Sequence, residues 1–122
     1  MKYLITDDSK MARKMVNKVL SEFISTDDEV LLAANGEEAV EIYKEHKPDL
    51  CFMDLTMPIM DGFDATFAIT QFDKDAKIIV ISADVQQGAI DKAKENGAIG
   101  FINKPIDSDK MKNILLKLEL IS

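Results

Sequence analysis

Five short apolar runs alternate along the chain with segments of helical periodicity, and this alternation restricts the possible folds more than any other feature. The runs cover residues 3–6, 29–33, 50–53, 78–82 and 99–102. Residues 3–5, 50–53 and 78–81 are almost continuously apolar, which is typical of strands that helices cover on both faces. The run at 29–33 is less uniformly apolar, so we expect it nearer an edge of the sheet.

Helices are predicted between the runs because apolar residues recur there at intervals of three and four. The first helix carries this pattern at Ala12, Met15, Val16, Val19, Leu20 and Phe23. Further helices are expected at residues 36–45, 63–72, 85–96 and 107–120. Pro48 and the Asn96-Gly97 pair are stop signals, and Asp107 or Ser108 is expected to cap the last helix.

This (βα)₅ order predicts a single α/β domain with a doubly wound, five-stranded parallel sheet between layers of helices. The length of 122 residues agrees with one domain, and the chain has neither repeats nor a linker. In such sheets, ligand sites lie beyond the carboxyl ends of the strands. The residues that directly follow the apolar runs are therefore the candidate functional residues.

The charge balance excludes some functions. There are 15 Lys and Arg residues against 22 Asp and Glu residues, which gives a net charge of −7. An acidic chain argues against nucleic-acid binding and against docking on anionic membranes. No apolar run approaches the roughly 20 residues of a membrane span, and no signal-peptide pattern opens the chain. With Cys51 as its one cysteine, inside an apolar run, the protein is expected to be cytoplasmic.

Charged residues follow three of the runs. Asp7 and Asp8 follow the first, Asp54 follows the third, and Lys104 follows the fifth. Clustered carboxylates at the ends of buried strands are costly unless a cation compensates them. Mg²⁺ is the usual compensating cation, since it takes oxygen ligands. Taken alone, the acidic pair has another interpretation, because Asp8 or Ser9 could simply cap the first helix.

Five motifs occur in a fixed order along the chain. They are Asp7-Asp8, Asp54 with Met57-Pro58, Asp61-Gly62, Ser82-Ala83 and Lys104-Pro105. With these motifs, the chain resembles the response-regulator receiver domains of bacterial two-component systems over essentially its whole length, and in particular the stand-alone, CheY-like type. The resemblance implies a flavodoxin/CheY-like sheet with strand order 2-1-3-4-5. It also implies a single receiver domain over residues 1–122, without an output domain.

The resemblance implies a role for each site residue. Asp54 is the phosphoryl acceptor, whose carboxylate attacks phosphorus to give an acyl phosphate. Mg²⁺ (or Mn²⁺) is bound directly by Asp8 and through water by Asp7. Asp54 and the backbone carbonyl of Thr56 are further ligands. Lys104 pairs with Asp54 before transfer and with a phosphoryl oxygen afterwards.

Two further residues resemble the family's switch positions. Ser82 is the hydroxyl that moves to bind the phosphoryl group, and Phe101 is the aromatic residue that turns inward behind it. Many family members have tyrosine at this position, so any signal from Phe101 has to come from packing and exposure. Ordinary core packing is the alternative interpretation of Phe101. Thr56 and Asp84 are expected to line the mouth of the site.

The function that the resemblance implies is a response regulator. It would take its phosphoryl group from a histidine kinase or a small phosphodonor, in a Mg²⁺-dependent reaction. Apart from assisting its own phosphorylation and dephosphorylation, it would not be an enzyme. It would signal by phosphorylation-dependent binding of an effector or motor protein, as in chemotaxis, through a face made by residues 85–96, 99–102 and 107–120.

The sequence leaves open which proteins phosphorylate and dephosphorylate the site. A basic stripe on the first helix is either a solvated face or a docking surface for a kinase or phosphatase; it consists of Lys10, Arg13, Lys14 and Lys18. His46 lies far from the expected site, so the donor histidine would belong to another protein.

Four other functions are alternatives to this one. The chain could be a phosphorelay intermediate that passes the group to a histidine phosphotransfer protein. A Mg²⁺-dependent phosphohydrolase of the haloacid-dehalogenase type would need Asp-x-Asp after the first strand, where this chain has adjacent aspartates. A flavodoxin-like cofactor carrier would meet repulsion between its phosphate and Asp-Asp-Ser-Lys. The complete set of site residues speaks against a receiver that is never phosphorylated.

Overall fold

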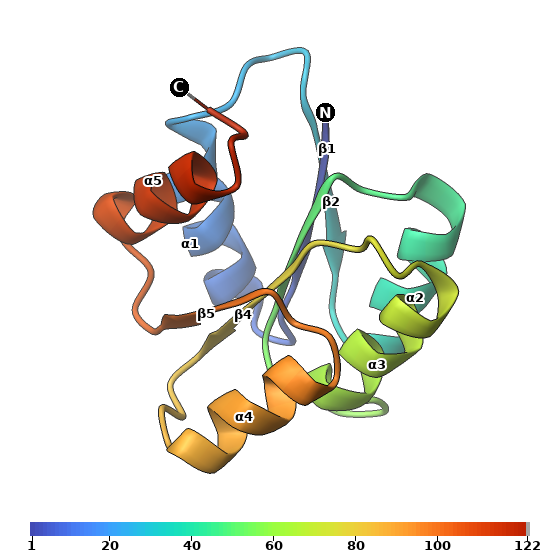
Figure 1. The fold of residues 1–122 in the computed structure, drawn as a ribbon. Coiled ribbons are helices and arrows are strands. Elements are labelled where there is room, and N and C mark those ends of the chain that lie inside the picture. The colour runs from blue at the N-terminus through green and yellow to red at the C-terminus, as the bar shows by residue number, and fades with distance from the viewer. Residues whose placement is uncertain (122) are drawn as a thin grey trace.

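The computed structural model describes residues 1–121, which form one five-stranded parallel sheet flanked by helices (Figure 1). The strands are β1 (Lys2–Thr6), β2 (Glu29–Ala33), β3 (Leu50–Met53), β4 (Ile78–Ser82) and β5 (Gly100–Asn103). The helices are α1 (Lys10–Ser21), α2 (Gly36–His46), α3 (Gly62–Phe72), α4 (Gln87–Glu95) and α5 (Ser108–Lys117). The order across the sheet is β2-β1-β3-β4-β5 with every pair parallel, which confirms the expected fold class and strand order.

The helices cover both faces of the sheet (Figure 1). On one face, α1 and α5 pack over a cluster that includes Leu20, Phe52 and Leu115. On the other face, α2 and α3 pack over a cluster around Tyr43 and Ile69, and a smaller cluster lies beneath α4. Because helices cover both faces, every residue of β3 and β4 is buried. All of these residues are apolar except Ser82, which ends β4.

The edge strands differ from the central ones. β2 lies at one edge, and only Ala33 of its five residues is buried, while Leu32 is 48% exposed. This confirms the expectation for residues 29–33. Cys51, in central β3, is fully buried. Within the described residues, no helix is both long and apolar enough to span a membrane.

Several predicted boundaries were wrong by one to three residues. α4 begins at Gln87 and ends at Glu95, not at residues 85 and 96, because the segment before it is a loop and Gln86 makes no side-chain capping bond. β5 runs one residue later than 99–102, since it is Gly100 that pairs with β4. α5 ends at Lys117, not at 120, because Glu119 adopts a left-handed backbone with φ of 60°.

The helix caps settle two alternatives that the sequence left open. Ser9, not Asp8, caps α1, and its hydroxyl accepts a hydrogen bond from the Ala12 amide. Asp107, not Ser108, caps α5 by accepting from the Lys110 amide. The Asp8 side chain therefore has no capping role and is available to the site.

Candidate functional site

The candidate site lies at the carboxyl edge of the parallel sheet, where the ends of β1, β3, β4 and β5 meet. The register pairs Thr6 with Met53, so the residues that follow these two strands are neighbours. The Asp54 amide donates a hydrogen bond of 2.9 Å to the Thr6 carbonyl, and the Asp7 amide donates one of 3.1 Å to the Ala33 carbonyl. The sheet itself thus brings Asp7 and Asp54 together.

Three carboxylates form a cluster at this edge. One oxygen each from Asp7, Asp8 and Asp54 lie within 4.8 Å of one another. Asp7 is 4% exposed and Asp54 is 8% exposed, whereas Asp8 is exposed. The cluster is therefore buried on one side and open to solvent at Asp8, which leaves it accessible to an ion.

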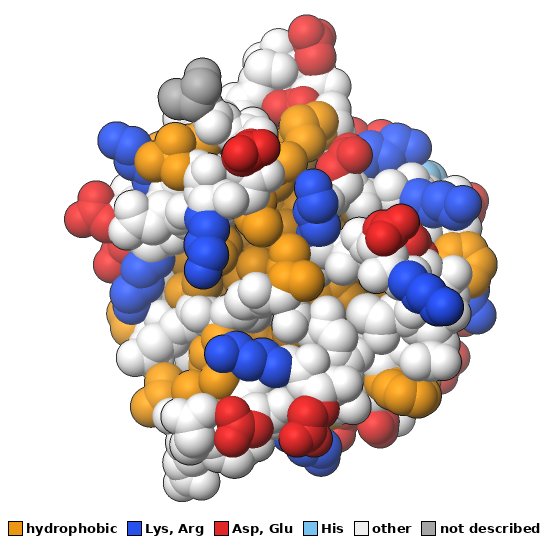
Figure 2. All heavy atoms as spheres, viewed as in Figure 1, with side chains coloured by type: hydrophobic (Ala, Val, Ile, Leu, Met, Phe, Trp, Pro, Cys, Tyr) orange, Lys and Arg blue, Asp and Glu red, His pale blue; other side chains and the backbone are white. Residues whose placement is uncertain are grey.

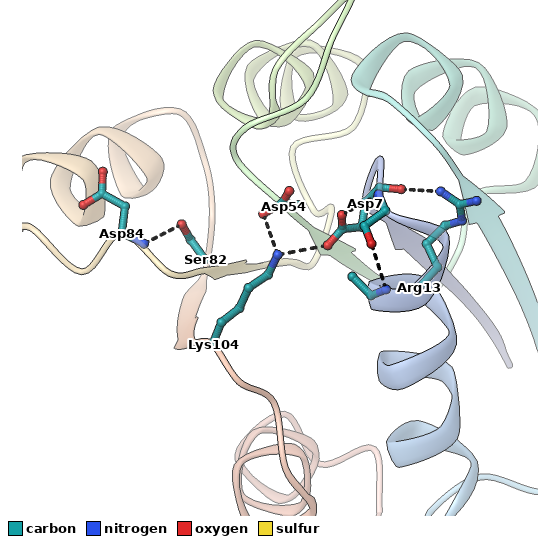
Figure 3. Close-up of polar contacts among 8 residues, drawn as sticks. Asp7, Arg13, Asp54, Ser82, Asp84 and Lys104 are labelled. Atoms are coloured by element: carbon teal, nitrogen blue, oxygen red, sulfur yellow. Dashed lines mark hydrogen bonds and ion pairs between the residues drawn. The ribbon is translucent and has the colours of Figure 1, made fainter.

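Lys104 reaches this cluster from the end of β5. Its ammonium lies 3.1 Å from Asp7 Oδ2 and 3.2 Å from Asp54 Oδ1 (Figure 3). The sequence predicted the pair with Asp54, and the structure adds the pair with Asp7. A single lysine thus faces both buried carboxylates of the cluster.

The electrostatics of the site follow from this crowding. Burial raises the pKa of the Asp54 carboxyl, and the charge on Asp7 raises it further, while Lys104 acts in the opposite direction. Burial lowers the pKa of Lys104, but the hydrogen bond to Asp7 and the charge on Asp54 outweigh it and leave this pKa raised. The ammonium is therefore fully charged at neutral pH and holds the carboxylates in place.

Arg13 is a site residue that sequence reasoning missed. Its guanidinium donates a 2.7 Å hydrogen bond to the backbone carbonyl of Asp7 (Figure 3). The Ser9 amide donates to Asp7 Oδ1 at 3.0 Å. The sequence placed Arg13 on the outward basic stripe, yet it is half-buried while Lys10 and the other lysines of the stripe are exposed. In the sequence, only its guanidinium distinguishes it from those lysines.

The predicted switch residues lie to one side of the carboxylates. Ser82 is buried at the end of β4, and its hydroxyl accepts a 3.0 Å hydrogen bond from the Asp84 amide (Figure 3). Phe101 is half-buried in β5 and packs against the small cluster beneath α4. Thr56 is exposed beside Asp54, and Asp84 is exposed beyond Ser82. His46 lies at the end of α2, remote from the site, as the sequence predicted.

The loop after Asp54 is folded tightly back on itself. The Gly62 amide donates to the Leu55 carbonyl at 2.9 Å. A Cβ atom on Gly62 would lie only 2.0 Å from the Asp54 carbonyl oxygen, so no larger residue fits without moving this backbone. Asp61 caps α3 through the Asp64 amide. The Asp61-Gly62 pair thus fixes the backbone that carries Asp54.

Comparison with known proteins agrees with this arrangement. The family model described as the response regulator receiver domain matches residues 3–116. The chain belongs to this family. It is therefore a response regulator of two-component signalling, and receiver domains are signalling proteins rather than classical enzymes.

Receiver domains similar to this chain include two proteins called chemotaxis protein CheY. The one from Halobacterium salinarum is 45% identical over 102 residues, which is 84% of this chain and 82% of that protein. The one from Bacillus subtilis is 45% identical over 109 residues, which is 88% of each chain. A chain in the crystal structure of the CheX-CheY-BeF3-Mg²⁺ complex from Borrelia burgdorferi superposes with a TM-score of 0.86 at 35% identity, over 98% of this chain and 89% of that one.

Proposed function

We propose that this receiver domain accepts a phosphoryl group on Asp54 and signals through the protein contacts that the modified form makes. The observation that carries the proposal is the meeting of Asp54 with Asp7, Asp8 and Lys104 at one edge of the sheet. The carboxylate nucleophile and the transferring phosphoryl group are both negatively charged, so each needs positive charge nearby. This cluster provides Lys104 and a group of carboxylates that could hold a cation. The resemblance to the CheY proteins supports the same assignment.

In the proposed reaction, an oxygen of the Asp54 carboxylate forms a bond to phosphorus. The phosphorus–nitrogen bond of a phosphohistidine breaks at the same time, and its electron pair leaves with the imidazole. With acetyl phosphate as donor, the phosphorus–oxygen bond breaks and acetate leaves. The product is an aspartyl phosphate. Lys104 lies 3.2 Å from Asp54 Oδ1, so its ammonium is close enough to donate to a phosphoryl oxygen attached there.

The donor set fits a hard divalent cation, Mg²⁺ or Mn²⁺. Three carboxylates lie within 4.8 Å of one another, and two of them are buried beside a single ammonium group, so one further cation would balance the charge. Asp8 and Asp54 would bind the ion directly, Asp7 would bind through water, and the Thr56 carbonyl would be a further ligand. When bound, the ion would neutralise charge on the transferring phosphoryl group.

The signal would leave through the face formed by α4, β5 and α5. Ser82 would turn from the Asp84 amide toward the phosphoryl group, and Phe101 would follow it inward. An effector or motor protein would then bind the altered face. The names of the two CheY relatives support a chemotaxis-type role over a phosphorelay intermediate or a Mg²⁺-dependent phosphohydrolase. The proposed partners at the site are a histidine kinase and, by analogy with the CheX-CheY complex, a phosphatase.

The test is intact-protein mass spectrometry after incubation with acetyl phosphate and Mg²⁺. We expect one added phosphoryl group on the wild type and none on Asp54→Ala, with the adduct lost when EDTA is present from the start. Asp64→Ala, which changes an exposed carboxylate on α3, is the matched control and should behave as the wild type does. An adduct on Asp54→Ala as well as on the wild type would refute the assignment of Asp54.

A further inference from the structure

Lys110, on the first turn of α5, binds two backbone carbonyls near the candidate site. Its ammonium donates one hydrogen bond of 3.0 Å to the Asn103 carbonyl and another of 2.9 Å to the Pro105 carbonyl. These carbonyls lie on either side of Lys104 in the chain. One side chain from α5 therefore holds the backbone before and after the lysine that reaches the carboxylates.

The contacts of Lys104 itself show why these two hydrogen bonds from Lys110 matter. Its backbone amide donates a 2.9 Å hydrogen bond to the Ser82 carbonyl, which fixes it to the end of β4. Its ammonium then extends to Asp7 and Asp54 (Figure 3). The side chain is long and flexible, so the direction in which it leaves the backbone decides whether its ammonium reaches both carboxylates. A lysine has three N–H donors, and Lys110 uses two of them on carbonyls beside this point.

We propose that Lys110 is a positioning residue, which fixes the loop around Lys104 and thereby keeps the Lys104 ammonium directed at Asp7 and Asp54. This inference rests on the proposed phosphoryl chemistry of Asp54. Because Lys110 has no contact with the carboxylates, it acts only through Lys104. Small displacements of a positioned group can cost a large factor in rate.

The surroundings of Lys110 supply a matched control. Lys110 and Lys117 both line a groove of about 290 Å³ over β5 and α5, together with Phe101 and Asn113. Figure 2 shows this face, where hydrophobic side chains and basic side chains lie side by side. Lys117 carries the same charge in the same groove but lies a further two turns along α5. Replacing Lys117 thus tests the effect of charge without the carbonyl contacts.

The first measurement is the rate of phosphoryl uptake from acetyl phosphate with Mg²⁺, at several donor concentrations. We expect Lys110→Met to lower the rate at saturating donor roughly 3- to 10-fold, with little change in the donor concentration for half-maximal rate. Lys110→Arg should recover most of the rate, because a guanidinium can donate to both carbonyls. Lys117→Met should match the wild type. An equal loss in Lys110→Met and Lys117→Met would refute the proposal, since charge alone would then explain it.

The second measurement needs neither metal nor phosphodonor. Amide hydrogen exchange reports the Lys104 amide, bonded to the Ser82 carbonyl, and the Cys51 amide, bonded to the Lys77 carbonyl inside the sheet. Lys110→Met should accelerate exchange at Lys104 and leave Cys51 unchanged. Equal acceleration at both amides would indicate general destabilisation and overturn the proposal, as would no change at either.

The two measurements also separate this proposal from the proposed function. If the wild type takes up no phosphoryl group, the assignment of Asp54 fails. The exchange at the Lys104 amide then still decides whether Lys110 fixes the loop.

Discussion

Lys104 faces two carboxylates at once, 3.1 Å from Asp7 and 3.2 Å from Asp54. Both carboxylates are buried, so removing the ammonium leaves two negative charges in a place that solvent screens poorly. The lysine side chain is itself 31% exposed, which moderates the effect. At the scale of single residues, we expect these two ion pairs to govern both the stability of the site and its proposed chemistry.

Lys104→Met should lower the free energy of unfolding by about 2 kcal/mol at pH 7 in the presence of EDTA. The reason is that the methionine fills the space of the lysine stem but does not compensate Asp7 or Asp54. Urea denaturation followed by circular dichroism measures the change. Lys112→Met, at an exposed position of α5, is the control and should stay within about 0.5 kcal/mol of the wild type. A loss of the same size in the control would contradict the ion-pair explanation.

Asp54→Asn should raise the free energy of unfolding, in contrast to Lys104→Met. Because the pKa of Asp54 is raised in the fold, the folded protein binds this proton more tightly than the unfolded chain does. Ionisation of Asp54 therefore lowers the free energy of unfolding as pH rises from the ordinary carboxyl range through the folded pKa. We expect the amide to stabilise the metal-free protein by about 1 kcal/mol at pH 7.

The pH dependence distinguishes this explanation from better packing. Below about pH 3, Asp54 is protonated in both states, so the advantage of Asp54→Asn should disappear. Urea midpoints of the two proteins at pH 7 and pH 3 provide the comparison. An advantage of equal size at both pH values would show that charge is not its source.

At the scale of elements, the tight return of the loop between β3 and α3 depends on Gly62. A Cβ atom there would lie 2.0 Å from the Asp54 carbonyl oxygen and 2.8 Å from the Leu55 Cα atom. Both are backbone atoms, so a side chain cannot move aside to relieve the contact. Gly88, near the start of α4, has no atom within 4 Å of its added Cβ.

The two glycines thus form a matched pair. Gly62→Ala should destabilise the fold by about 2–3 kcal/mol and reduce phosphoryl uptake, since it displaces the backbone that carries Asp54. Gly88→Ala should stabilise it by about 0.5 kcal/mol, because alanine restricts the unfolded chain and suits a helix better. Thermal unfolding with the mass-spectrometric uptake assay measures both effects. A Gly62→Ala protein as stable as the wild type would contradict the expected clash between a Cβ atom at residue 62 and the Asp54 carbonyl oxygen.

At the scale of the whole molecule, Cys51 reports on the integrity of the sheet. It lies in central β3 and is fully buried, and this burial raises the pKa of its thiol to about 12. Because the thiolate is the reactive form, the native thiol should be inert on both grounds. Only opening of the sheet exposes it.

Labelling with a thiol reagent at pH 8 should therefore leave the native protein unmodified and modify it once in urea. The midpoint of labelling in short pulses should coincide with the midpoint from circular dichroism, as a single cooperative transition requires. Labelling at urea concentrations well below that midpoint would show that the sheet opens locally around β3 before the rest of the fold.

The order of strands and helices could be predicted from sequence because each element carries a local pattern. The apolar runs placed β3 and β4, and the helical spacing placed α2 and α3, to within a residue at each end. The larger errors lie at the start of α4 and the end of α5, where the boundaries depend on a loop and a left-handed residue. Local patterns do not record these features strongly.

The sequence by itself determined which residue types follow each strand, and the rules of parallel sheets then placed Asp7, Asp8, Asp54 and Lys104 at one edge. Only the tertiary structure decided that Lys104 reaches Asp7, from which it is separated by 97 residues, as well as Asp54. It also decided that Arg13 binds the Asp7 carbonyl and that Lys110 binds the carbonyls beside Lys104. The physical reason is that strand order fixes where a backbone ends, whereas the reach of a side chain depends on distances between segments that are remote along the chain.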